Sequence, residues 1–70
     1  MAYEADISDK LGSLETLTNR RSREEGPRRN VDVEEFDIVG ADGRTVGVLI
    51  IRESMDPSPP FYVHRTVTRQ

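Results

Sequence analysis

The hydrophobic positions of this chain follow two different periods. Four of them recur at intervals of three or four residues near the N-terminus, the spacing of one helix face: Ile7, Leu11, Leu14 and Leu17. From Phe36 to Ile51 apolar residues are dense, and residues 61–69 are rich in β-branched and aromatic types. The pattern predicts an α+β fold, with an N-terminal helix packed on a small three-stranded antiparallel β-meander.

The helix is expected over residues 5–25. Asp6 or Ser8 is suited to cap its start, and Gly26-Pro27 must end it. The four-residue stripe is narrow, and such a helix is weak in water unless it lies on another surface. Residues 26–33 are expected to form a linker, followed by the sheet over residues 34–69.

Two registers are open for the hairpin formed by the first two predicted strands. A two-residue loop, Asp42-Gly43, places Phe36 opposite Leu49. A three-residue loop combines a type I turn from Gly40 to Gly43 with a left-handed Gly43, and it places Phe36 opposite Val48. The second register separates apolar from polar positions better and is the prediction. It gathers five residues on one face, beneath the helix: Phe36, Ile38, Val46, Val48 and Ile50.

The third strand is expected within residues 61–69, after a connection stiffened by Pro57, Pro59 and Pro60. Residues 48–51 are apolar on both faces, which is typical of a central strand. The three strands are therefore expected in chain order with the second in the middle, and residues 1–70 form one small domain.

Composition excludes several kinds of site. The 70 residues include no Cys and one His, so disulfides, thiolate metal sites and two-histidine zinc sites are ruled out. No cofactor is expected. The net charge of −3 gives no general attraction to nucleic acid or anionic membranes. The longest apolar run, residues 48–51, is too short to span a bilayer, and the acidic start does not resemble a signal peptide. A cytoplasmic protein is expected.

Catalysis is not expected. His64 has no convergent acid and nucleophile in the sequence, and it is interpreted as a half-exposed strand residue. The stretch "GADG" lacks the spacing of a phosphate-binding loop and indicates a turn. Two carboxylates on one strand face, such as Glu35 and Asp37, suit Mg²⁺ or Ca²⁺, but edge-strand charge that prevents stray pairing is the favoured reading.

Five arginines cluster where the helix is expected to end: Arg20, Arg21, Arg23, Arg28 and Arg29. Glu24 and Glu25 interrupt the cluster, and no nucleic-acid-binding motif accompanies it. A solvated linker is the favoured interpretation. Contacts with phosphates or with an acidic protein surface are the alternatives.

The second face of the predicted sheet carries apolar residues that one helix is unable to cover: Val39, Leu49 and Ile51, with Phe61, Tyr62 and Val63 of the third strand. An exposed apolar face and open strand edges are typical of interaction surfaces. The sequence predicts a small non-catalytic protein-binding module, an accessory subunit or an inhibitor of a larger assembly, or a self-associating protein. The alternative is a nucleic-acid-associated protein that contacts phosphates through residues 20–29.

Overall fold

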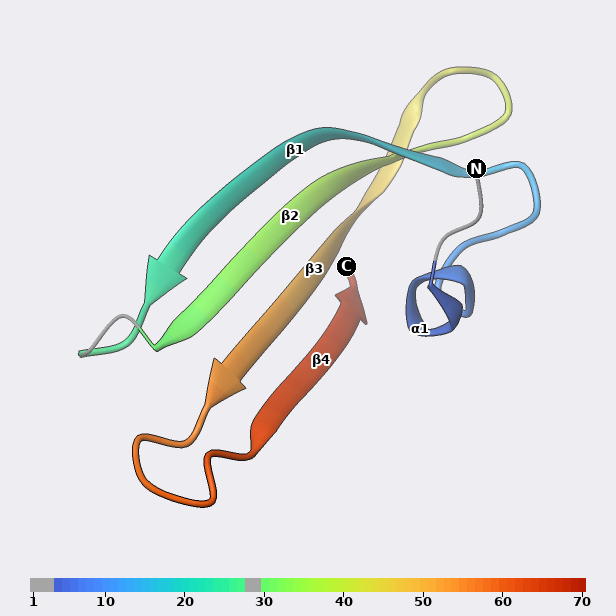
Figure 1. Ribbon diagram of the computed structural model, residues 1–70. Helices are drawn as coiled ribbons and strands as arrows, with labels where there is room; N and C mark the ends of the chain where they lie inside the picture. The colour runs from blue at the N-terminus through green and yellow to red at the C-terminus, as the bar shows by residue number, and fades with distance from the viewer. Residues whose placement is uncertain (1–3, 28–29) are drawn as a thin grey trace.

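The protein is a single twisted, four-stranded antiparallel sheet with one helical turn against it (Figure 1). The computed structural model describes residues 4–27 and 30–70. Its elements are α1 (Ala5–Ser8), β1 (Thr16–Glu25), β2 (Val31–Val39), β3 (Thr45–Met55) and β4 (Val63–Arg69). The strands lie side by side in chain order, and the molecule is long and narrow, with extents of 46 × 21 × 19 Å.

The predicted fold, an N-terminal helix over residues 5–25 packed on a three-stranded meander, is wrong. Residues 16–25 form the strand β1, and the α-helix is limited to Ala5–Ser8. The linker predicted over residues 26–33 is also too long, because β2 begins at Val31. An isolated helix with a narrow apolar stripe is weak, whereas pairing with β2 satisfies the backbone groups of β1 along most of its length.

Three of the four residues in the predicted helical stripe still reach the core, although only the first is helical. Ile7 is buried, and Leu11 and Leu17 pack partly buried against the same cluster. Leu14 is exposed, because the chain turns between Gly12 and Glu15, where the Glu15 amide donates to the Gly12 carbonyl at 3.2 Å. The apolar spacing therefore identified core residues but not the backbone conformation that brings them there.

The turn between β2 and β3 is confirmed. The Gly43 amide donates to the Gly40 carbonyl at 3.0 Å, and Gly43 has φ +83°, a left-handed conformation that glycine adopts without steric cost. Val39 lies opposite Thr45, as the three-residue loop requires.

The predicted register beyond the turn is wrong. A bulge follows at once, because Ile38 lies opposite Gly47 and Val46 is the extra residue. Phe36 therefore faces Leu49 instead of Val48. One inserted residue exchanges the two faces of β3, and the larger side chains Leu49 and Ile51 turn toward α1.

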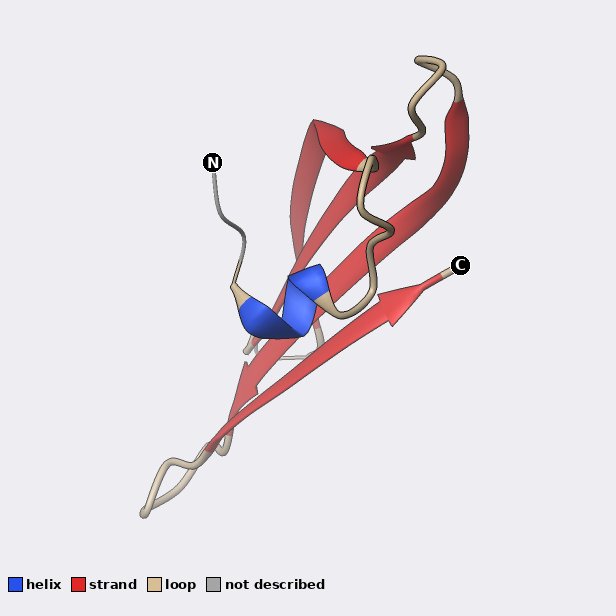
Figure 2. Ribbon diagram, turned by 90° about the vertical axis from the view of Figure 1, so that its right-hand side faces the viewer, coloured by secondary structure: helices blue, strands red, loops and turns tan. Residues whose placement is uncertain are grey.

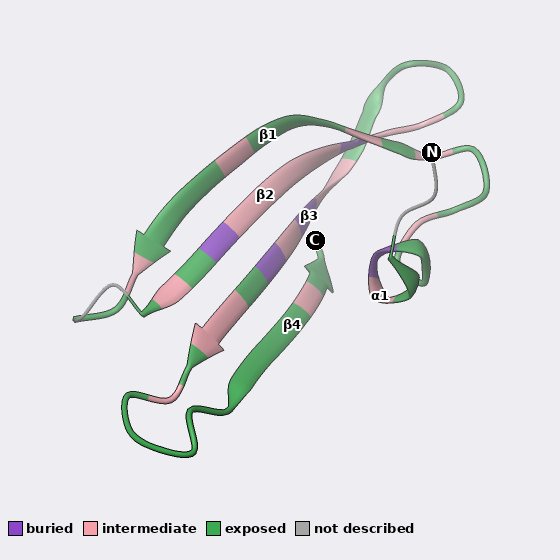
Figure 3. Cartoon of the chain, in the orientation of Figure 1, coloured by how far each residue is buried: buried purple, intermediate pink, exposed green. Residues whose placement is uncertain are grey.

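We call the side of the sheet on which α1 packs the helix-covered face. Its core is formed by Ile7, Ile38, Leu49 and Ile51, with partly buried Leu11, Leu17, Phe36 and Val67 packed against it. Figure 2 shows α1 in front of the strands, and Figure 1 shows it nearer the C-terminal end of β4 than the start of that strand. Figure 3 shows that the buried strand positions lie in β2 and β3. The central position predicted for residues 48–51 is confirmed, because β3 pairs with both β2 and β4.

Candidate binding surfaces of the sheet

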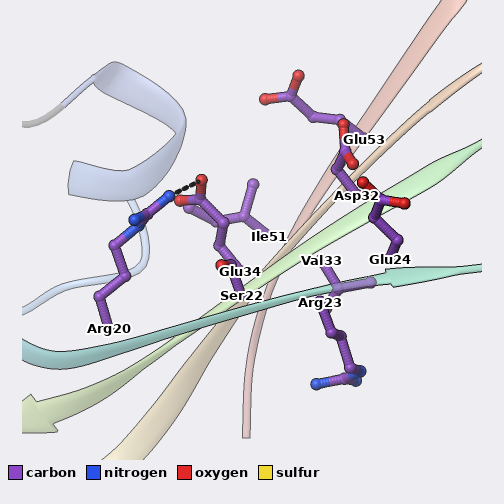
Figure 4. A pocket seen from close by; sticks show the side chains of 9 residues that line it. All are labelled: Arg20, Ser22, Arg23, Glu24, Asp32, Val33, Glu34, Ile51 and Glu53. Carbon is purple, nitrogen blue, oxygen red and sulfur yellow. Dashed lines mark hydrogen bonds and ion pairs between the residues drawn. The ribbon is translucent and has the colours of Figure 1, made fainter.

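An open groove lies on the helix-covered face beyond the end that α1 covers (Figure 4). Its volume is about 460 Å³, and the residues that line it are Arg20, Ser22, Arg23, Glu24, Asp32, Val33, Glu34, Ile51 and Glu53. Ile51 contributes apolar surface from β3. Four of the lining residues carry carboxylates, and they come from three strands: Glu24, Asp32, Glu34 and Glu53. The groove therefore has an acidic character.

The strand register explains why these acids meet. Glu24 lies opposite Asp32, and Asp32 lies opposite Glu53, so one row across β1, β2 and β3 carries a carboxylate at every position. The row continues onto β4, where Arg65 lies opposite Glu53 and bonds to it. Figure 4 shows the Glu24, Asp32 and Glu53 side chains on the same side of the sheet.

Of the two arginines that line the groove, Arg20 is the one that bonds to another lining residue. Its guanidinium lies 2.9 Å from the Glu34 carboxylate. The hydrogen bond from Arg20 lowers the pKa of Glu34, and the same bond raises the pKa of Arg20. In this pair the carboxylate is held ionised and its charge is balanced from β1.

The opposite side of the sheet, which we call the ion-paired face, carries six charged residues that bond across strands: Arg21, Arg23, Glu25, Glu35, Asp37 and Arg52. The pKa of Glu25 is lowered by hydrogen bonds from Arg23 and Arg52, and that of Glu35 is lowered chiefly by Arg23. In Figure 4 the Arg23 side chain points away from the groove, toward this face.

Beneath this network lies Val33, which is 1% exposed. Both of its cross-strand neighbours are arginines, Arg23 on β1 and Arg52 on β3. Glu25 joins the two guanidinium groups, at 2.8 Å and 2.6 Å. The aliphatic stems of the two arginines therefore cover the valine while their charged ends remain at the surface.

β1 is interrupted between Thr18 and Arg21, where the register with β2 shifts by one residue. Asn19 has φ +54°, a left-handed conformation that asparagine tolerates better than most residues. Its side-chain amide donates to Asp37 at 3.0 Å, and this bond, together with one from Arg21, lowers the pKa of Asp37. The bulge directs Arg20 into the groove and Arg21 to the ion-paired face.

The structure places the predicted arginine cluster as follows. Arg20, Arg21 and Arg23 belong to β1 and each bonds to a carboxylate of β2. Arg28 and Arg29 lie outside the described residues. The three described arginines are therefore cross-strand partners within the sheet, and phosphate contacts through them stay a prediction that nothing in their geometry favours.

The residues predicted to bind a partner fall into two groups. Leu49 and Ile51 are 0% and 5% exposed, so both are core residues of the helix-covered face, although Ile51 also borders the open groove. Val39 is partly buried at the end of β2. Phe61, Tyr62 and Val63 are 51–64% exposed, and they lie together where the chain enters β4.

His64 lies on β4 opposite Ser54, and its Nε2 is 3.0 Å from the Asp56 carboxylate. Both members of this pair are exposed at the end of the β3–β4 hairpin, and neither lines the groove. Glu35 and Asp37 do share a face, as expected, but arginines occupy them. Within residues 4–27 and 30–70 no group of three or more acidic or histidine side chains is arranged to hold a metal ion.

Sequence reasoning missed the charge pairing of β1 with β2. The signal was present, because Arg21 and Arg23 alternate at the strand period, as do Glu35 and Asp37. Opposite charges at matching positions favour an antiparallel pair. Reading the arginines as a solvated linker hid that complementarity.

The chain matches no protein-family model, no curated protein sequence and no solved structure. No helix among residues 4–27 and 30–70 has the length and apolar character needed to cross a membrane.

Proposed function

We propose that this protein is a small, non-catalytic protein-binding module that accepts an added strand along the open edge of β4. The observation that supports this proposal most strongly is that the edge is both regular and exposed. β4 is seven residues long, pairs with β3 without a register shift, contains no proline, and has only Val67 partly buried. A regular, exposed edge strand is a template for pairing with another chain.

The backbone groups available on that edge follow from the hydrogen-bond alternation of an antiparallel pair. Gln70 and Val48 exchange both of their backbone bonds, at 2.8 and 3.1 Å. Alternation then directs the amides and carbonyls of Thr68, Thr66 and His64 toward β3. The same groups of the intervening residues point outward: Val63, Arg65, Val67 and Arg69. Each of these four residues supplies one N–H and one C=O, and an added strand would form hydrogen bonds with these eight groups.

The charges of β4 are turned back onto its own chain. Arg65 bonds to Glu4, Asp6 and Glu53. Arg69 bonds to Glu15 at 2.6 Å and to the Lys10 carbonyl at 3.0 Å. Unpaired charge is a usual protection of an edge strand, and here that charge is neutralised by side chains of the N-terminal segment and β3.

The other edge of the sheet differs. β1 has a bulge at Asn19–Arg20, and half of its ten residues carry charged side chains. Both features are typical of an edge protected from further pairing. Of the two edges, β4 is therefore the one suited to a partner.

Exposed apolar side chains adjoin the start of β4. Met55 lies opposite Val63, and Phe61 and Tyr62 precede it, all of them about half exposed or more. An incoming strand that pairs with β4 would have this patch at one end, where burial of apolar surface adds to the backbone bonds.

The test uses two substitutions at one position. Arg65→Pro removes the outward amide and places a ring on the edge, while Arg65→Ala loses the same three ion pairs but keeps the amide. Tagged wild-type and variant chains are used to recover bound proteins from the native cell. We expect partners held by wild type and by Arg65→Ala to be lost with Arg65→Pro. Equal recovery by all three chains would contradict the proposal.

A further inference from the structure

We propose that the strand which pairs with the β4 edge is β4 of a second copy of this chain, related by a two-fold axis through Thr66. This inference rests on the proposed function, because it names the partner of the same edge. It follows from the register that the sequence of β4 allows when the strand meets itself.

Two antiparallel copies of one strand have few ways to pair. A two-fold axis normal to the sheet keeps opposed residues on the same face. The axis must therefore pass midway between the two copies of one residue, which lie opposite each other, and we call this residue the centre of the register. Three central positions leave a useful length of β4 paired: Arg65, Thr66 and Val67. The outward backbone groups and the two arginines decide among these three registers.

The register centred on Thr66 is the best of the three. It places Arg65 opposite Val67 of the second copy and Val63 opposite Arg69, and each such pair exchanges two backbone bonds. All eight outward groups of each strand are then used. On the ion-paired face, Thr66 meets Thr66 and His64 meets Thr68, pairs without like charge.

The other two registers pair fewer outward backbone groups and place arginines opposite each other. Centring on Arg65 puts two arginines directly opposite each other and leaves Arg69 unpaired. Centring on Val67 places Arg65 opposite Arg69 twice and leaves Val63 unpaired. Each uses six of the eight outward groups, and like charges directly opposite in a sheet are destabilising.

The rest of the fold permits this arrangement. The N-terminal segment reaches β4 through the side chains of Arg65 and Arg69, and among the described residues no backbone bond is made to the outer edge of β4. Figure 3 shows β4 as an almost fully exposed ribbon beside the partly buried β3. Pairing would join two four-stranded sheets into one of eight, with both α1 turns on the same side.

One seven-residue edge is a small interface, so self-association should depend on concentration. The full chain has a mass of 7.9 kDa. We expect the mass measured by light scattering or sedimentation to rise toward twice 7.9 kDa, the dimer value, between about 1 µM and 1 mM. A mass that stays at the monomer value over this range would overturn the inference.

Thr66→Asp tests the position of the axis. In the monomer the new carboxylate faces Arg52, which lies opposite residue 66 on β3, so the fold should be retained. In the dimer it faces the carboxylate introduced at the same position of the second copy. Because these like charges repel, self-association should weaken at least about tenfold. Thr68→Asp is the matched control, because it would face His64 of the second copy. Equal dimerisation of wild type and Thr66→Asp would contradict the register.

Cross-linking gives a readout that does not require the charged variant to fold. The chain has no cysteine, so Thr66→Cys introduces a single thiol. Opposed residues in a non-hydrogen-bonded pair have Cα atoms about 4.5 Å apart, within disulfide range. Thr68→Cys would place its two thiols on Cα atoms roughly 14 Å apart. We expect oxidation to cross-link Thr66→Cys quickly and Thr68→Cys slowly, and the reverse order would overturn the inference.

The failures of the two proposals are distinguishable. A wild-type monomer that still recovers another protein, and loses it with Arg65→Pro but not Arg65→Ala, overturns the second copy as partner and supports the edge as a binding site. A dimer that survives both Arg65→Pro and Thr66→Asp overturns the second copy as the partner of this edge, because such a dimer would use another surface, whereas equal recovery of partners by wild type, Arg65→Ala and Arg65→Pro overturns the edge itself as a binding site.

Discussion

The two faces of this sheet bury valine, leucine and isoleucine by different means. On the helix-covered face, Ile38, Leu49 and Ile51 contact apolar side chains, including Ile7 from α1. On the ion-paired face, Val33 is as deeply buried, yet its cross-strand neighbours are Arg23 and Arg52. One face is closed by another piece of chain, and the other by the stems of charged side chains.

The difference shows how a short chain lacking disulfides covers a sheet on both sides. A chain of 70 residues has few apolar side chains to spare, and 33% of its residues are charged. Long cationic side chains cover apolar surface while their ends stay in water, and the carboxylates opposite hold those ends in place. The ion pairs therefore contribute more through the position of the stems than through their Coulomb energy, which is small for exposed pairs.

The largest expected effect comes from the helix-covered face. Leu49→Ala removes a fully buried side chain from the centre of the core, and a loss of about 2–5 kcal/mol in the free energy of unfolding is expected. Because small domains are only marginally stable, complete unfolding is within that expectation. Urea denaturation followed by circular dichroism measures it. Val46→Ala, at the exposed bulge residue, is the control and should change stability little. A loss below about 1 kcal/mol for Leu49→Ala would place the core elsewhere.

A smaller effect is expected where arginine stems cover the sheet. Arg52→Met keeps most of the aliphatic stem and removes the charge, whereas Arg52→Ala removes both. We expect Arg52→Ala to lower the free energy of unfolding by about 0.5–1.5 kcal/mol and Arg52→Met by less, because exposed ion pairs contribute little. Denaturant unfolding at low and high salt separates the two contributions. If Arg52→Met is as destabilising as Arg52→Ala, the pair with Glu25 matters more than the cover over Val33.

The turn between β2 and β3 and two of the strands were predictable from the sequence, whereas the orientation of β3 was not. The turn from Gly40 to Gly43 was predictable because only a few residue types adopt its left-handed position. The strands β3 and β4 were predictable from their β-branched residues. The β2 residues on the face that α1 covers, Phe36 and Ile38, were also predicted correctly. The β3 residues on that face were not, because the extra residue at Val46 reverses β3 and nothing local in the sequence requires a bulge there.

β1 was mispredicted for a related reason. Its residues have helical spacing near Leu17 and strand spacing from Arg21 onward, and tertiary pairing decides between them.

The residues predicted to bind a partner were placed correctly only where their position did not depend on the strand register. Leu49 and Ile51 were expected on the surface because the register was displaced by one residue, whereas Phe61, Tyr62 and Val63 depend on no register and are exposed as expected. Edge position, which carries the proposed function, follows from the strand order and not from any short motif.

The smallest expected effect lies at the rim of the helix-covered face, where charge fastens the N-terminal segment to β4. Hydrogen bonds from the Arg69 side chain and from the Gly12 amide lower the pKa of Glu15 from 4.5 to about 2. A carboxyl whose pKa is depressed by folding stabilises the protein above its unfolded pKa, near 4.5, and this stabilisation is lost as pH falls toward about 2.

Glu15→Gln should therefore lower stability slightly at pH 7, flatten the dependence of stability on pH between about 5 and 2, and match wild type below about pH 2. Urea midpoints measured at each pH test this. Leu14→Ala is the control, since it changes an exposed position of the same segment without removing a titratable group, and its dependence of stability on pH should follow wild type. If Glu15→Gln keeps the full acid dependence of the wild type, the Arg69 contact does not persist in solution, and α1 is held on the sheet by its apolar residues and by the Arg65 ion pairs with Glu4 and Asp6.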